Sequence, residues 1–163
     1  MQEVISNELL VKKYLDQDII EYFQKKMPKE QEARLILKLV ELLKYFLLSE
    51  YFKGDIPFSE ELDEVWHLWI LQTKEYASLM EKLPYKKFIH HSSHEYVEKN
   101  EKKMSLKEKI NMQFSYLVSY RFNFGLFKVE EILFYPYAMA LLKERNMNLE
   151  DFNVYLKQKI SII

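Results

Sequence analysis

The chain has 163 residues, a formal net charge of -1, no cysteine and only two glycines. Without cysteine there is no disulfide framework, thiolate zinc site, cysteine nucleophile or iron–sulfur cluster. Gly54 and Gly125 are far apart, so the glycine-rich loops that hold nucleotide phosphates are absent too, and we expect no nucleotide cofactor. Any metal site must use histidine and carboxylate ligands.

The charge balance argues against a general nucleic-acid binder, which needs a basic surface to displace counterions from phosphates. Only Arg34, Arg121 and Arg145 among the 24 basic residues are arginines, the side chain best suited to bidentate phosphate binding. The start of the chain lacks the basic and apolar regions of a secretory signal, and no apolar run is long enough to span a membrane. We therefore expect a cytoplasmic protein that binds neither nucleic acid nor membranes.

In chain order, the first predicted elements are three long helices, because glycine and proline are too scarce for many turns. Apolar residues recur with helical spacing over residues 6–27 and 29–52. The second of these helices is apolar around much of its circumference, which is typical of a central, buried element. A third helix is predicted over residues 59–83, with Ser59 as its N-cap and Pro84 as its stop.

The second half of the chain begins with a predicted irregular segment, residues 85–104. Ser105 then starts a helix that is predicted to reach about residue 122, because Glu108 completes a capping box. The helical pattern over residues 128–145 contains Pro136, which must either kink one helix or start a new one.

A last helix is predicted over residues 149–160, with Asn148 as its cap. No repeat, linker or low-complexity stretch divides the chain. The sequence thus predicts an all-α fold: one domain, residues 1–163, forming a helical bundle of about six helices. Its core is expected around residues 35–52 and 62–80.

All four histidines fall within one short stretch of the chain, as His67, His90, His91 and His94. His67 lies one helical turn after Asp63, at the edge of the apolar stripe of the third predicted helix. We predict a metal site in which His67 is joined by His90 and by either His94 or His91, with Asp63 as a ligand or as the hydrogen-bond partner of His67. Imidazoles and a carboxylate suit Zn²⁺, Fe²⁺ or Mn²⁺ and leave a position for water, as a metal-dependent enzyme requires.

The alternative interpretation is structural. The spacing matches no standard metal-binding signature. His67 would then be hydrogen-bonded to Asp63 at a helix boundary, and the other histidines would be solvated or would tie the loop to the helix. In that case the protein is a non-enzymatic interaction module that binds a protein partner. The aromatic residues that would form either a core or a partner-binding surface are Phe114, Tyr116, Tyr120, Phe122, Phe124 and Phe127.

One stretch of the sequence, about residues 59–95, resembles a known family. Asp63 is followed by Trp66-His67, then by an Ile-Leu-x-Thr-x-x-Tyr pattern that ends at Tyr76, and then by Phe-Ile-His90-His91. These motifs are similar to those of the bacterial relatives of the glycine-rich domain-containing proteins. The resemblance implies a site formed by Asp63, Trp66, His67, Tyr76, His90 and His91, without His94, and it implies no particular activity.

The sequence departs from the pattern of this family at three places. Leu79-Met80 stands where Phe-Cys is usual, Lys86 stands in place of a glycine, and Ser93 stands in place of a proline. The histidines are unaffected by these changes.

Overall fold

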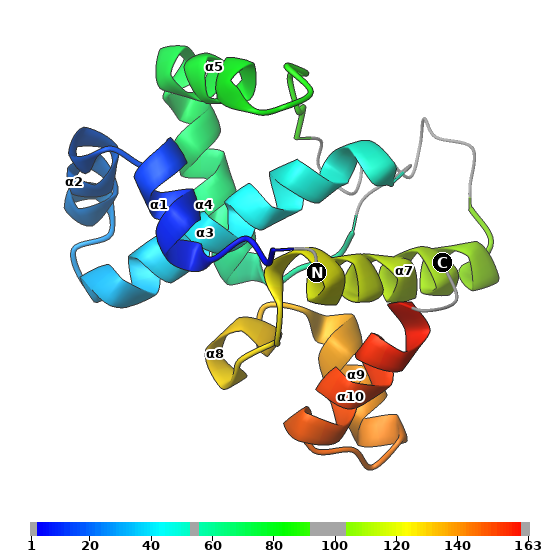
Figure 1. Ribbon diagram of the computed structural model, residues 1–163. Coiled ribbons are helices and arrows are strands. Elements are labelled where there is room, and N and C mark those ends of the chain that lie inside the picture. Colours follow the sequence, from blue (N-terminus) through cyan, green and yellow to red (C-terminus); the bar gives the residue numbers. More distant parts are fainter. Residues whose placement is uncertain (1–2, 53–55, 92–103, 161–163) are drawn as a thin grey trace.

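The computed structural model of the protein describes residues 3–52, 56–91 and 104–160. Over these ranges it has helices and no strand, so the predicted all-α class is confirmed (Figure 1). The described helices are α1 (Asn7–Tyr14), α2 (Gln17–Lys26), α3 (Glu32–Leu48), the 3-10 turn η1 (Ser49–Tyr51), α4 (Glu60–Leu71), α5 (Thr73–Lys82), α7 (Leu106–Phe124), α8 (Val129–Ile132), α9 (Pro136–Glu144) and α10 (Leu149–Ile160). The described part therefore has nine α-helices, more than the predicted six.

Two of the predicted long helices are each divided by a short break. At the first break Leu15 is extended, and Asp16 starts α2 by accepting a hydrogen bond from the amide of Ile19 on its carboxylate, at 2.9 Å. At the second break Gln72 leaves the helical conformation between α4 and α5, and its side-chain amide donates to the hydroxyl of Tyr22 at 2.8 Å. Both breaks thus lie where a polar group finds a partner, and neither needs glycine or proline.

The C-terminal helices begin close to their predicted positions. The capping box of Ser105 and Glu108 is present at the start of α7. Pro136 occupies the first turn of α9, so it starts a new helix rather than kinking one. Asn148 accepts a hydrogen bond from the amide of Asp151 at 2.8 Å and so caps α10 as predicted.

Gly125 ends α7 with a φ of +89°, a backbone conformation that glycine adopts readily. A Cβ atom at this position would lie 3.1 Å from a methyl group of Val4. Next to it, the amide of Ile5 donates to the carbonyl of Asn123 at 2.9 Å. The segment that precedes α1 is therefore packed against the end of α7.

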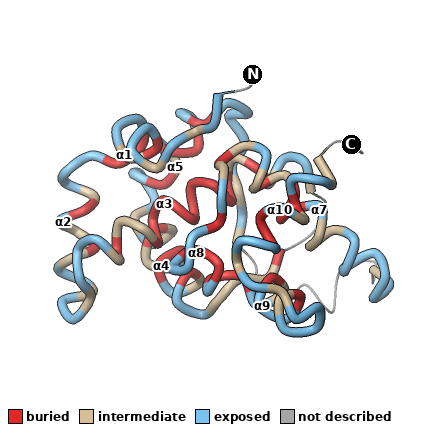
Figure 2. The backbone as a smooth tube through the Cα atoms, turned by 60° about the horizontal axis from the view of Figure 1, so that its bottom comes forward, coloured by how far each residue is buried: buried red, intermediate tan, exposed pale blue. Residues whose placement is uncertain are grey.

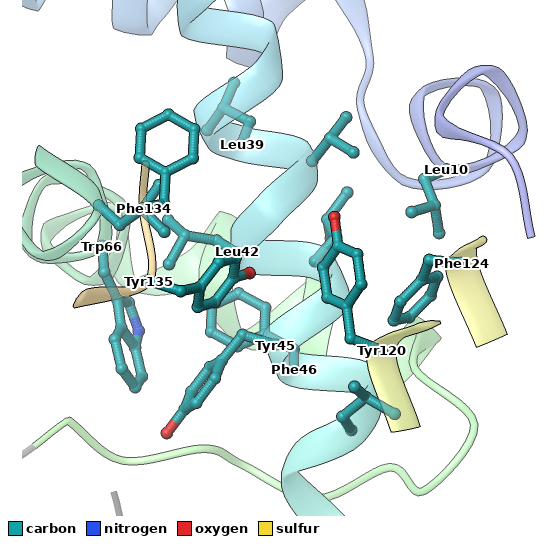
Figure 3. Close-up of a cluster of buried hydrophobic side chains, with 14 of the residues drawn as sticks. Leu10, Leu39, Leu42, Tyr45, Phe46, Trp66, Tyr120, Phe124, Phe134 and Tyr135 are labelled. Atoms are coloured by element: carbon teal, nitrogen blue, oxygen red, sulfur yellow. The ribbon is translucent and has the colours of Figure 1, made fainter. Parts of the chain in front are cut away.

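Helix α3 lies at the centre of the fold, with α1, α2 and α4 packed on it and α7 crossing it (Figure 1). Every residue from 38 to 46 is buried, which confirms that this helix is the central element. Figure 2 shows the buried positions concentrated along α3 and on the inner sides of its neighbours. Around it, Tyr45 and Phe46 of α3 make ring contacts with Trp66 of α4, each at 5.4 Å between centroids (Figure 3).

The core also contains charged groups, which we call the Glu41 network: Glu41, Lys44, Glu131, Tyr120 and Tyr135. The ammonium of Lys44 lies 2.6 Å from the Glu41 carboxylate and 3.4 Å from that of Glu131. Tyr120 and Tyr135 donate hydrogen bonds to the two oxygens of Glu41, at 2.9 and 2.7 Å. Burial raises the pKa of the Glu41 carboxyl, although Lys44 and the hydroxyl of Tyr135 oppose this effect.

The aromatic residues at the end of α7 contribute mainly to the core. Tyr116, Tyr120, Phe124 and Phe127 are buried, whereas Phe122 is 41% exposed. Most of this group therefore forms interior packing rather than a surface. No helix in the described ranges is long and apolar enough to cross a membrane.

Candidate metal centre

The candidate site is built from α4 and from the irregular segment that follows α5. Asp63 and His67 lie one turn apart on the solvent side of α4, which is held in the core by the buried side chains of Trp66 and Trp69. After α5 the chain turns back through Lys86, which has a φ of +47°. This turn brings His91 to α4.

Asp63, His67 and His91 converge, and we call them the triad. The Nε2 atoms of His67 and His91 are 3.1 Å apart, and the Nε2 atom of His91 is also 3.1 Å from Oδ1 of Asp63. One ligand atom from each residue lies within 4.8 Å of the other two, so the triad could hold a metal ion. In a tetrahedral zinc site, where each ligand atom is about 2.0–2.1 Å from the metal, neighbouring ligand atoms are ~3.3 Å apart. This distance is close to the 3.1 Å separations in the triad.

Asp63 also orients the ring of His67. The Nδ1 atom of His67 lies 2.7 Å from the backbone carbonyl oxygen of Asp63 and 3.1 Å from its Oδ2 atom. Both of these oxygens are acceptors, so Nδ1 carries the proton and Nε2 presents its lone pair toward His91. A histidine that binds a metal commonly donates its other ring N–H to a carbonyl or carboxylate in this way.

A second layer of contacts fixes His91. Its ring packs at 4.3 Å, centroid to centroid, against the indole of Trp66. The indole N–H of Trp66 donates to the hydroxyl of Tyr76 at 3.0 Å, and this hydroxyl donates to the carbonyl of Ile89 at 2.7 Å. Burial raises the pKa of Tyr76 to about 12, so the hydroxyl remains protonated at neutral pH. Directly behind the triad, these contacts connect α4 and α5 with the segment that follows α5, residues 83–91, which we call the returning segment.

The triad lies at the surface and is partly shielded. The side chains of His67 and Asp63 are 56% and 41% exposed, whereas that of His91 is 15% exposed. Water or a small ligand can therefore reach the triad from the solvent side, whereas the indole of Trp66 closes the other side. An ion held there would have positions accessible to solvent.

The structure places the other predicted ligands differently. His90 is exposed and its ring lies 4.8 Å from that of Phe88, so it is outside the triad. Phe88 itself is 45% exposed and contacts Tyr76 edge-on, whereas Ile89 packs on the core. His94 lies outside the described residues.

Sequence reasoning missed two features. The carbonyl of Ile89 cannot be identified from a residue type, because every residue has one. The Glu41 network had a signal: Glu41 and Lys44 are spaced i, i+3 and are the charged residues between Leu39 and Leu48, a stretch of α3 that is otherwise apolar or aromatic. Charges at such positions must find partners inside the core.

Comparison of the chain with protein-family models, with curated proteins and with solved structures gives no match. The triad and its surroundings are therefore interpreted from their own geometry.

Proposed function

We propose that this protein binds one divalent transition-metal ion through Asp63, His67 and His91. The observation that carries the proposal is the convergence of two imidazole nitrogens and one carboxylate oxygen, with neighbouring separations of 3.1 Å. The oriented Nδ1 atom of His67 supports it further, because this orientation leaves Nε2 available as a ligand.

Two imidazoles and one carboxylate are a ligand set for Zn²⁺ and for non-haem Fe²⁺, and the same set accepts Mn²⁺. Three protein ligands leave at least one position for water or substrate. Such a metal lowers the pKa of bound water or polarises a bound carbonyl or phosphoryl oxygen. We accordingly propose a metal-dependent enzyme, with a hydrolase or an oxygen-using enzyme as the reaction classes.

Metal binding is tested on the purified protein and three single variants: His67→Ala, His91→Ala and His90→Ala. We expect the wild type to bind one equivalent of Zn²⁺, Fe²⁺ or Mn²⁺ and to gain thermal stability on binding. His67→Ala and His91→Ala should each lose this binding. His90→Ala is the matched control, because the same residue type is removed from the adjacent position, and it should bind like the wild type. Isothermal titration and elemental analysis measure the stoichiometry.

Two results would refute the proposal: a wild type that neither contains metal nor shifts in melting temperature with any of the three ions, or equal losses in all three variants. Open coordination is tested with Co²⁺ in place of the native metal. Azide should change the visible spectrum if a position is exchangeable, and an unchanged spectrum would contradict a catalytic centre.

A structural role for the same residues is the second proposal, and one observation favours it. The Nε2 atom of His91 lies within hydrogen-bond distance of both Asp63 and His67, at 3.1 Å each, so direct hydrogen bonds alone can account for the arrangement. In this case the triad ties the returning segment to α4 in a protein that acts by binding a protein partner. His91→Ala would then destabilise the fold, and metal would not change the melting temperature of the wild type.

A further inference from the structure

We infer that Tyr76 is a positioning residue of the proposed metal site and that its hydroxyl sets the affinity for the ion. This inference rests on the proposed function. Tyr76 belongs to α5, its hydroxyl is hydrogen-bonded to Trp66 and Ile89, and it would not be a ligand. Its effect is exerted through the two groups that hold His91 in place.

The first of these groups is the backbone that carries His91. Asp63 and His67 are fixed by α4, whereas His91 lies in an irregular segment after α5. Within that segment, the carbonyl of Ile89 accepts a hydrogen bond of 2.7 Å from the Tyr76 hydroxyl, two residues before His91. This hydrogen bond joins the segment to the helical part of the protein close to the ligand.

The second group is the indole of Trp66, against which the His91 ring packs at 4.3 Å. The indole N–H donates to the same Tyr76 hydroxyl at 3.0 Å. One oxygen atom therefore fixes both the backbone before His91 and the ring behind it. Without that oxygen, His91 would lose its fixed distance to the Nε2 atom of His67, and part of the binding free energy would be used to order the segment.

The test is Tyr76→Phe, which removes the hydroxyl and retains the ring that contacts Phe46 and Phe88. Groups that orient metal ligands typically contribute 10–100-fold to affinity, and we expect Zn²⁺ affinity to fall about tenfold, at the lower end of this range. Stoichiometry should stay at one. Isothermal titration with Zn²⁺, with far-UV circular dichroism to verify folding, provides the measurement.

Tyr120→Phe is the matched control. It also removes a buried hydroxyl, one that contacts Glu41 at 2.9 Å and Lys44 at 2.7 Å in the Glu41 network. It should lower the melting temperature and leave Zn²⁺ affinity unchanged. If Tyr76 acted only through the overall stability of the fold, both variants would lose Zn²⁺ affinity equally, and that result would overturn the inference. A wild-type Zn²⁺ affinity in Tyr76→Phe would also overturn it.

A measurement on the unmodified protein covers the case in which Tyr76→Phe does not fold. Because coupling between two sites is reciprocal, Zn²⁺ should slow hydrogen exchange at the Trp66 indole N–H and at the amides of residues 88–91. The indole N–H of Trp69, whose ring packs on Phe23 and Phe46, is the internal reference. Equal exchange with and without bound Zn²⁺ would overturn the inference. If the wild type binds no Zn²⁺, Fe²⁺ or Mn²⁺ at all, the proposed function itself fails, and this result is distinct from both outcomes above.

Discussion

The two imidazole rings of the triad carry their protons on different nitrogen atoms. His67 must be protonated on Nδ1, because both groups near that atom are oxygen acceptors of Asp63. Its Nε2 atom is then an acceptor, so the 3.1 Å contact with His91 requires a proton on Nε2 of His91. A metal ion would occupy the place of that proton.

This assignment predicts a change of tautomer on metal binding. In the metal-free protein, nitrogen-15 correlation spectra should show His67 as the Nδ1–H form and His91 as the Nε2–H form. After addition of Zn²⁺, His91 should change to the Nδ1–H form, while His67 keeps its proton on Nδ1. An unchanged His91 tautomer at saturating Zn²⁺ would contradict its role as an Nε2 ligand.

Adjacent histidines illustrate what can be predicted for the site from sequence alone. The i, i+4 spacing of Asp63 and His67 predicts their contact, because residues one turn apart lie on the same face of a helix. No such rule chooses between His90 and His91. The choice depends on how the returning segment is anchored. The side chain of Ile89 packs on the core and its carbonyl accepts a hydrogen bond from Tyr76, and both are contacts between separate elements of the fold.

At the scale of elements, the helix starts differ in how their first amides are satisfied. Asp16 accepts the amide hydrogen of Ile19 with its side chain. Ser59 occupies the equivalent position before α4, as predicted, but its hydroxyl makes no capping hydrogen bond. Instead, the backbone amide of Ser59 donates to the carbonyl of Phe134 at 2.8 Å. The start of α4 is therefore fixed by the segment between α8 and α9.

These two caps predict unequal effects of the same substitution. Asp16→Ala should lower the free energy of unfolding by about 1 kcal/mol, the usual contribution of a capping side chain. Ser59→Ala should change it by less than about 0.5 kcal/mol, because no side-chain cap is lost. Urea denaturation followed by circular dichroism measures both values. Equal destabilisation would show that the Ser59 hydroxyl caps α4 in solution.

The predicted helices were correct in type and wrong where one periodic segment is divided into two helices. Residues 6–27 and 59–83 each keep an apolar pattern with helical spacing across a break, at Leu15 and at Gln72. Both halves of each segment face the same core, so the pattern continues while the helix axis changes. The break near Leu15 depends on a local cap, whereas that at Gln72 has a partner, Tyr22, on another helix.

At the scale of the whole molecule, the Glu41 network joins the two halves of the chain. Glu41 and Lys44 come from α3, whereas Tyr120, Glu131 and Tyr135 come from α7, α8 and the start of α9. Figure 3 shows Tyr120 and Tyr135 lying beside α3 within the aromatic core. The buried charges are thereby paired and hydrogen-bonded, which is the condition for tolerating them in a core.

The network predicts how stability depends on pH. Burial raises the pKa of Glu41 above its ordinary value of 4.5, so the folded protein holds this proton more tightly than the unfolded chain. The stabilisation that this bound proton gives the fold is complete below pH 4.5. It is lost as the pH rises through the folded-state pKa of Glu41, and the free energy of unfolding then falls by up to about 1.4 kcal/mol per pH unit. The free energy of unfolding of the wild type should therefore fall from pH 4.5 upward relative to that of Glu41→Gln. Urea denaturation across this range measures the difference, and a constant difference would contradict the raised pKa.

The packing of Val4 and Ile5 against the end of α7 has a consequence for synthesis on the ribosome. The chain emerges from its N-terminus, so Val4 and Ile5 are made long before Asn123 and Gly125, the residues that they contact. Until α7 emerges, the segment before α1 has no docking place and Glu41 lacks the hydroxyl of Tyr120. We therefore expect the N-terminal helices to complete their packing only after α7 to α9 have left the exit tunnel.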